Sequence, residues 1–236
     1  MGNLKDYRNK ELKYYVVANV LVILLASDAF SLINIVLGGV ATPKVAINVF
    51  EIITKQLVSA GLLISIACIY AFVLDAIISS EFKYKICYLC FWKQPGYTIF
   101  TSIREGKVTD DRFSQTDFLG KYKNILNYIE KIADKNERMK FENQNWYNIY
   151  NRFRNEGIVF GANKDYLLCR DLCIMSLLLL IAYILFRFLS PIQFSYKVAL
   201  FVIAEFIICD IAFWIKGKRL ALNVIALDIH TKSIIS

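Results

Sequence analysis

Several residue types that build active sites are scarce in this chain of 236 residues. Its only histidine is His230, and the Cys-x-x-Cys pair of Cys87 and Cys90 has no second cysteine or histidine pair near it. A structural zinc site needs four such ligands. The sequence also contains no Gly-rich phosphate loop, no Gly-x-Ser-x-Gly motif and no His-Glu-x-x-His motif. We therefore expect no catalytic residue, no metal and no cofactor, so the chain is not expected to be an enzyme. We expect Cys87 and Cys90 either to pack among apolar side chains or to be reversibly palmitoylated.

Proline and glycine are few as well, with three and ten residues, which argues against a disordered or fibrous chain. What the sequence has in excess is apolar side chains. It is 57% hydrophobic and 20% charged, with a formal net charge of +8, whereas soluble domains are roughly 45–50% apolar and about 25% charged. Such an excess indicates either one very large core or a set of membrane spans.

Four long apolar runs decide between these alternatives. They cover residues 14–37, 57–79, 167–189 and 196–215, and each is near the ~20 residues needed to cross a bilayer. Buried helices of a soluble protein would each show a polar face, which these runs largely lack. We predict an all-α membrane protein with four transmembrane helices and a small, mostly helical cytoplasmic domain inserted between helices 2 and 3.

The lysines and arginines orient these helices. Residues 80–166 hold fifteen of them and the N-terminal tail holds four, whereas the 190–195 turn holds none. Because basic residues stay on the cytoplasmic side, both termini are expected there. The predicted organisation is a basic cytoplasmic tail (1–13), transmembrane helices 1 and 2 (14–79), a cytoplasmic sensor or oligomerisation domain (80–166), transmembrane helices 3 and 4 (167–215) and a cytoplasmic tail (216–236).

The cytoplasmic insert carries fifteen basic against eleven acidic residues, a net charge of +4. Leu119, Tyr122, Leu126, Ile129 and Ala133 recur at helical spacing, with Ser114 and Thr116 available as N-caps. This stripe predicts a helix that packs on another helix of the domain or on a second subunit. Further along, we expect Asn163 to cap a helix that runs from Lys164 into the third span, so that the insert could move this span directly.

Residues 144–154 interleave aromatic, amide and guanidinium side chains on a predicted helix. Trp146, Tyr150 and Phe153 share one face, which we assign to the core. The adjacent face carries the candidate ligand-binding residues Tyr147, Asn151, Arg152 and Arg154. Such groups stack on bases and bind phosphates. The face is either an anion-binding site or an ordinary solvated or subunit-contact surface.

Ionisable and polar residues also occur inside the predicted spans, at Asp28, Ser31, Asn34, Glu205 and Asp210. A charge at mid-span costs at least ~2.5–3.5 kcal/mol, so each needs a partner or a hydrated cavity. One interpretation is interhelical hydrogen bonding. The other is a water-filled path, which an acidic lining would make favourable to cations and which would need several subunits.

The order of these segments resembles small bacterial four-span anti-phage membrane effectors gated by nucleotide signals. The Hailong-type effector channel and the tetraspan effectors of nucleotide-signalling operons are the most similar in layout. The resemblance covers the whole chain as architecture and includes no diagnostic motif. It implies the bacterial inner membrane, a homo-oligomer such as a tetramer, an anionic nucleotide or oligonucleotide ligand, an upstream nucleotidyltransferase that makes the signal, and ion flux as the output. A non-conducting scaffold or sensor that recruits a partner protein, and a small transporter, remain the alternatives.

Overall fold

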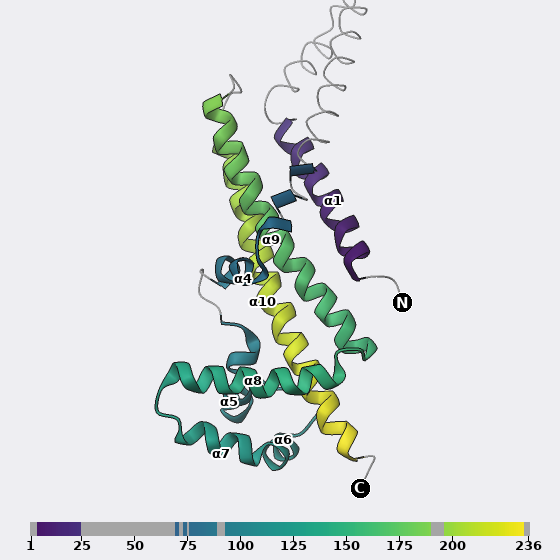
Figure 1. Ribbon diagram of the computed structural model, residues 1–236, viewed down its shortest axis with the longest axis vertical. Helices are drawn as coiled ribbons and strands as arrows, with labels where there is room; N and C mark the ends of the chain where they lie inside the picture. Colours follow the sequence, from purple (N-terminus) through teal and green to yellow (C-terminus); the bar gives the residue numbers. More distant parts are fainter. Residues whose placement is uncertain are drawn as a thin grey trace, which may run out of the picture. The chain divides into compact units, whose positions relative to one another are not determined.

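A computed structural model describes residues 4–24, 69–70, 73–74, 76–88, 93–189 and 196–233, and within these ranges all regular structure is helical. The elements in chain order are α1 (Leu4–Leu24), α4 (Ser80–Tyr88), the short 3₁₀ helix η2 (Pro95–Tyr97), α5 (Ile99–Arg104), α6 (Gln115–Lys121), α7 (Lys123–Lys131), α8 (Lys135–Phe153), α9 (Gly157–Leu189) and α10 (Tyr196–Ser233) (Figure 1). The all-α prediction is confirmed for this part of the chain.

Two of these helices, α9 and α10, are long and apolar enough to cross a membrane. They contain the third and fourth predicted spans, at 167–189 and 196–215. Most of the first two predicted spans lies outside the described residues. Helix α10 does not end with its predicted span but continues through the segment assigned to the C-terminal tail as far as Ser233. Within that continuation Leu220, Ala221 and Val224 are buried.

The predicted cap at Asn163 is wrong, because α9 begins at Gly157 and Asn163 lies in its interior. The backbone N–H of Phe160 already donates to the carbonyl of Glu156 at 2.8 Å. Since this bond starts the helical ladder one turn earlier, no cap is required at residue 163. The last residues of the insert, from Gly157 on, and the third predicted span are therefore parts of one uninterrupted helix.

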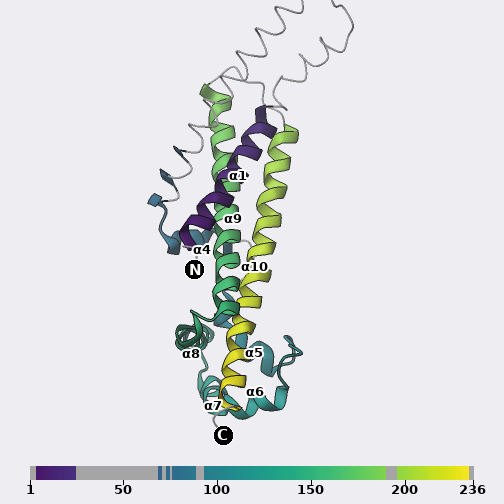
Figure 2. The same ribbon diagram turned by 90° about the vertical axis from the view of Figure 1, so that its right-hand side faces the viewer.

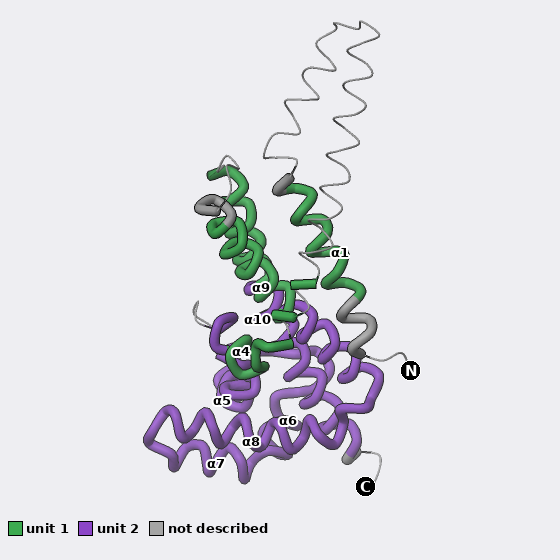
Figure 3. The backbone as a smooth tube through the Cα atoms, turned by 45° about the horizontal axis from the view of Figure 1, so that its top comes forward, with its two compact units in different colours: residues 1–84, 170–209 green, residues 85–169, 210–236 purple. Residues whose placement is uncertain are grey.

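The chain divides into two compact units (Figure 3). Unit 1 contains residues 1–84 and 170–209, and unit 2 contains residues 85–169 and 210–236. In unit 1 the Tyr15 hydroxyl of α1 lies 2.7 Å from Ser176 Oγ of α9 and 3.3 Å from Glu205 Oε2 of α10. The same unit buries an ion-paired group, in which Arg170 Nη2 is 2.9 Å and Lys83 Nζ is 3.5 Å from Asp171 Oδ1.

In unit 2 the short helices gather around the C-terminal part of α10 (Figure 2). Their core is aromatic: Phe100 of α5 and Phe118 of α6 are fully buried, and Tyr122 packs against both, at ring-centroid distances of 5.2 and 5.0 Å. Such ring pairs add a specific geometry to the hydrophobic stabilisation. Val224 and Ile225 of α10 are fully buried in the same unit.

The apolar stripe predicted for 119–133 is divided between two helices. Ser114 caps α6 by accepting from the Asp117 N–H at 3.1 Å, as expected, but Tyr122 leaves helical geometry with φ −102° and ψ 16° between α6 and α7. Tyr122 and Leu126 are buried as the stripe predicts, whereas Leu119 and Ala133 at its ends are exposed. The buried residues of the stripe therefore pack against other helices of unit 2.

A buried carboxylate from α8 caps α5. Thr98, at the N-cap position of α5, makes no side-chain cap bond. Glu142 replaces it, accepting from the Thr101 N–H at 3.1 Å and from Thr101 Oγ1 at 2.5 Å. Burial raises the pKa of the Glu142 carboxyl, and the bonds from Thr101 offset this only in part.

This raised pKa predicts a pH dependence of stability. The native protein holds the Glu142 proton to a higher pH than the unfolded chain, so stability from this group is complete below the unfolded pKa and is lost as pH rises through the native pKa. Glu142→Gln keeps a neutral acceptor for Thr101. As pH rises from acidic to neutral, the unfolding free energy of this variant should fall less than that of wild type, by on the order of 1 kcal/mol. Denaturant unfolding in detergent at a series of pH values measures this. The exposed Glu156→Gln is the control, and parallel pH profiles for wild type and Glu142→Gln would contradict the assignment.

Gly217 permits two other segments of unit 2 to approach α10 closely. A Cβ atom there would lie 2.8 Å from Tyr166 Cε2 and 2.9 Å from Pro95 Cγ. Both contacts are shorter than carbon atoms tolerate. Tyr166 is itself held in place, since its ring stacks on Phe213 at 4.6 Å and its hydroxyl lies 2.8 Å from the Tyr88 hydroxyl.

Gly217→Ala should therefore destabilise unit 2 by about 1–3 kcal/mol through overpacking. Gly120→Ala is the matched control, because no atom lies within 4 Å of a Cβ placed there. In the helix interior it should stabilise by roughly 0.5–1 kcal/mol. Thermal unfolding of the detergent-solubilised variants checks both signs. An unchanged midpoint for Gly217→Ala would show that Tyr166 and Pro95 move aside at little cost.

Candidate functional site

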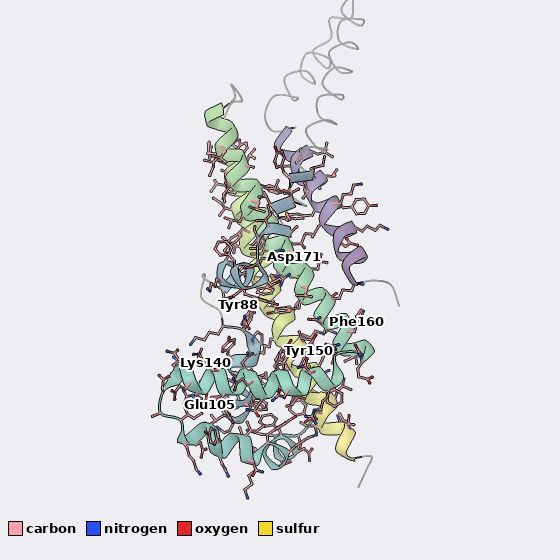
Figure 4. The ribbon with its side chains drawn as sticks, viewed as in Figure 1. Tyr88, Glu105, Lys140, Tyr150, Phe160 and Asp171 are labelled. Carbon is pink, nitrogen blue, oxygen red and sulfur yellow. The ribbon has the colours of Figure 1, made fainter. Side chains whose placement is uncertain are left out.

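The candidate ligand-binding residues lie together at the C-terminal end of α8. Tyr147 is 52% exposed, the Arg152 side chain is 59% exposed, and Asn151 and Arg154 are also exposed. The opposite end of α8, where Lys140 lies, is well separated from Tyr150 (Figure 4). Each of the four candidate side chains is thus accessible, as a ligand site requires.

Aromatic rings hold this end of α8 against α10. Trp146 stacks on Tyr150 with a centroid distance of 5.4 Å and an interplanar angle of 17°, and its indole N–H donates to the Ala221 carbonyl at 3.4 Å. Tyr147 continues the group, 5.7 Å from the Tyr150 ring. Trp146, Tyr150 and Phe153, which we assigned to the core, are half-buried, whereas the buried side chains of α8 are Glu142 and Ile149.

Arg152 does not point only into solvent. Its Nη2 lies 3.2 Å from Oδ1 of Asp228 on α10. Asp228 also receives Lys121 Nζ at 3.1 Å and the Tyr122 hydroxyl at 2.7 Å, and Lys121 Nζ donates to the Asp228 backbone carbonyl as well. We call Lys121, Tyr122, Arg152 and Asp228 the Asp228 cluster. It joins the α6–α7 junction, α8 and α10 at one point.

The electrostatics of the Asp228 cluster follow from burial. Asp228 is 4% exposed and the Lys121 side chain 13% exposed, so the ion pair is poorly screened by water. Burial, together with the neighbouring carboxylate, raises the pKa of the Tyr122 hydroxyl. Tyr122 therefore stays protonated and donates to Asp228, and two cations surround a single carboxylate.

Asp228 was not predicted as a site residue, because it lies in the segment assigned to the C-terminal cytoplasmic tail. Apolar residues at helical spacing continue past the fourth predicted span, among them Leu220, Val224 and Ile225. This pattern could have indicated that the helix continues into a packed unit. His230, assigned to the same tail, is exposed on α10, with Nε2 2.7 Å from the Arg112 carbonyl oxygen.

A second polar contact also ties α10 to the insert. Arg112 Nη1 donates to Asn223 Oδ1 at 2.7 Å, while Nη2 and Nε bind the Asp110 carboxylate at 2.6 and 2.8 Å. Asp110 Oδ1 also accepts from the Arg112 backbone N–H at 3.0 Å, which closes a local turn. The guanidinium of Arg112 holds the pKa of the Asp110 carboxyl below its ordinary value.

The polar residues of the predicted spans are described only in part. Asp28, Ser31 and Asn34 lie outside the described residues. Glu205 belongs to unit 1, where it accepts from Tyr15 of α1, the arrangement expected for interhelical hydrogen bonding. Asp210 belongs to unit 2 and is 4% exposed.

Among the residues that the structure describes, no three His, Cys, Asp or Glu side chains are grouped to hold a metal ion. Cys87 is buried, and Cys90 lies outside the described ranges. No protein-family model, no curated protein and no solved structure matches the chain.

The Asp228 cluster predicts a large loss of stability on substitution. Asp228→Ala leaves Lys121 buried without its carboxylate and should lower the unfolding free energy by about 3–5 kcal/mol. Asp165→Ala is the control, because the Asp165–Lys216 pair at 2.7 Å is 45% and 35% exposed and should contribute at most ~1 kcal/mol. Denaturant unfolding in detergent measures both. Equal effects for the two variants would show that burial adds nothing to the Asp228 pair.

Proposed function

We propose that this chain is an oligomeric membrane effector, an ion channel of the bacterial inner membrane that opens when its cytoplasmic unit binds an anionic nucleotide or oligonucleotide during anti-phage defence. Several copies form the pore, because the helices of one chain leave little room for one. The observation that carries the proposal is the continuity of α9 and α10, each of which runs from a candidate span into unit 2.

The membrane part of the proposal is supported by where the apolar residues of α10 lie. In its most apolar window only 22% of the residues are buried within the chain, whereas the core helix of a soluble protein would be mostly buried. The large exposed apolar side chains of α10 are Tyr196, Leu200, Phe201, Ile203, Ile207, Ile208, Ile211 and Ile215. Lipid tails and neighbouring copies would cover this surface.

The gating part is supported by the absence of a flexible connection along these two helices. Residues 157–189 form one helix and 196–233 another, so a displacement of their ends in unit 2 is carried along the helix axis. Binding would favour an open arrangement only if that arrangement binds the ligand more tightly. The ligand site is Tyr147, Asn151, Arg152 and Arg154.

The ligand part is supported by the chemistry at the end of α8. Two exposed guanidinium groups can bind phosphate in a bidentate manner, and the exposed Tyr147 ring offers a stacking surface for a base. The net charge of +4 on residues 80–166 would favour the approach of an anion.

The test measures ion flux in proteoliposomes that contain the protein. The proteoliposomes are exposed to a nucleotide extract from phage-infected cells that carry the genes adjacent to the one that encodes this chain. Arg152→Gln combined with Arg154→Gln should reduce signal-triggered flux about 100-fold or more, since each charge-assisted bond contributes roughly 1.5–3 kcal/mol. The matched control is Lys135→Gln with Lys140→Gln, which removes two exposed charges from the other end of α8 and should leave flux unchanged.

Triggered flux that survives in the arginine variant would place the ligand elsewhere. No flux from wild type, with a partner protein retained through the insert, would favour the scaffold. Saturable solute uptake by a monomer or dimer would favour the transporter. These outcomes separate the channel from its two alternatives.

A further inference from the structure

Three side chains from two parts of unit 2, the α6–α7 junction and α8, converge on the carboxylate of Asp228. Lys121 ends α6, Tyr122 separates α6 from α7, and Arg152 lies in the last turn of α8. Their donor atoms lie 3.1, 2.7 and 3.2 Å from the Asp228 oxygens. An ammonium, a hydroxyl and a guanidinium group directed at one point are the donor set that proteins use to bind phosphate.

The cluster carries more positive charge than its occupant neutralises. Lys121 and Arg152 contribute two cations, and Asp228 contributes one anion. Lys121 also donates to the Asp228 backbone carbonyl, so two oxygens of Asp228 direct its ammonium group toward this point. A phosphate dianion would match this charge better than the single carboxylate does.

The cluster can also be reached from solvent. The Arg152 side chain is 59% exposed although its partner is 6% exposed, so solvent reaches the side chain that pairs with the buried carboxylate. Tyr147, Asn151 and Arg154 are exposed on the same end of α8. A ligand that binds there therefore meets Arg152 first.

We infer that Lys121, Tyr122 and Arg152 form a phosphate-binding site that the Asp228 carboxylate occupies when no ligand is present, and that a phosphate group of the ligand displaces Asp228. The inference rests on the proposed function in one respect, since it takes the ligand to bind at the end of α8. Displacement breaks the side-chain contacts through which Asp228 ties the end of α10 to α6 and α8. Asp228 is thus a competitor of the ligand as well as a structural residue.

Competition gives a prediction opposite to that of a purely structural role. Asp228→Asn removes the competing charge, so inorganic pyrophosphate should bind this variant about tenfold more tightly than wild type, and Arg152→Gln should bind it about tenfold more weakly. Isothermal titration of the full-length protein in detergent, at constant ionic strength, measures both. Asp165→Asn is the control and should match wild type. Equal or weaker binding by Asp228→Asn would overturn the inference.

A measurement on wild type keeps the test valid if Asp228→Asn does not fold. Saturating pyrophosphate should speed backbone hydrogen exchange in residues 220–233 of α10 and slow it in residues 146–154 of α8. Slower or unchanged exchange at the end of α10 would overturn the inference. Sodium chloride at equal ionic strength separates binding of phosphate from a general salt effect.

These assays are independent of ion flux. Tight pyrophosphate binding by Asp228→Asn without any triggered flux in wild type would retain the inference and reject the channel. Triggered flux that depends on Arg152 and Arg154, with no change in affinity for Asp228→Asn, would retain the proposed function and reject the competition.

Discussion

The buried carboxylate of Asp228 is the constraint on which the arrangement of unit 2 depends. An ionised group that is 4% exposed cannot be left without partners, because its desolvation costs several kcal/mol. Its partners come from the α6–α7 junction and from α8. Pairing this one charge therefore fixes where three helical segments meet α10, and the aromatic core of Phe100, Phe118 and Tyr122 packs within that frame.

Two of the buried carboxylates of unit 2, Asp228 and Glu142, have different kinds of partner. Asp228 contacts two cations directly, whereas the hydrogen bonds to Glu142 come from neutral groups such as the amide and the hydroxyl of Thr101. Neutral donors offset less of the cost of burial than cations do, and the pKa of Glu142 is raised accordingly. Both groups tie α8 to another helix, but only the Asp228 cluster has a charge pattern that a phosphate could share.

Local patterns predicted the helices better than their ends. The stripe at Tyr122, Leu126 and Ile129 and the cap at Ser114 follow from neighbouring residues, and the structure contains both. The start of α9 and the length of α10 were not foreseen, because helix ends depend on packing as well as on capping residues. The capping role of Glu142 was not predicted either, because its partner Thr101 is distant in sequence and no spacing rule connects the two residues.

The sequence by itself determined the all-α class, the long apolar helices and the accessible face of α8, since these depend on composition and on the 3.6-residue period. Only the tertiary structure decided that residues 216–233 form a packed helix and that Arg152 of the accessible face shares the Asp228 carboxylate with Lys121. The physical reason is that a buried charge selects its partners by distance in space. Residues 121, 152 and 228 are brought together by folding, and no local pattern in the chain records that they meet.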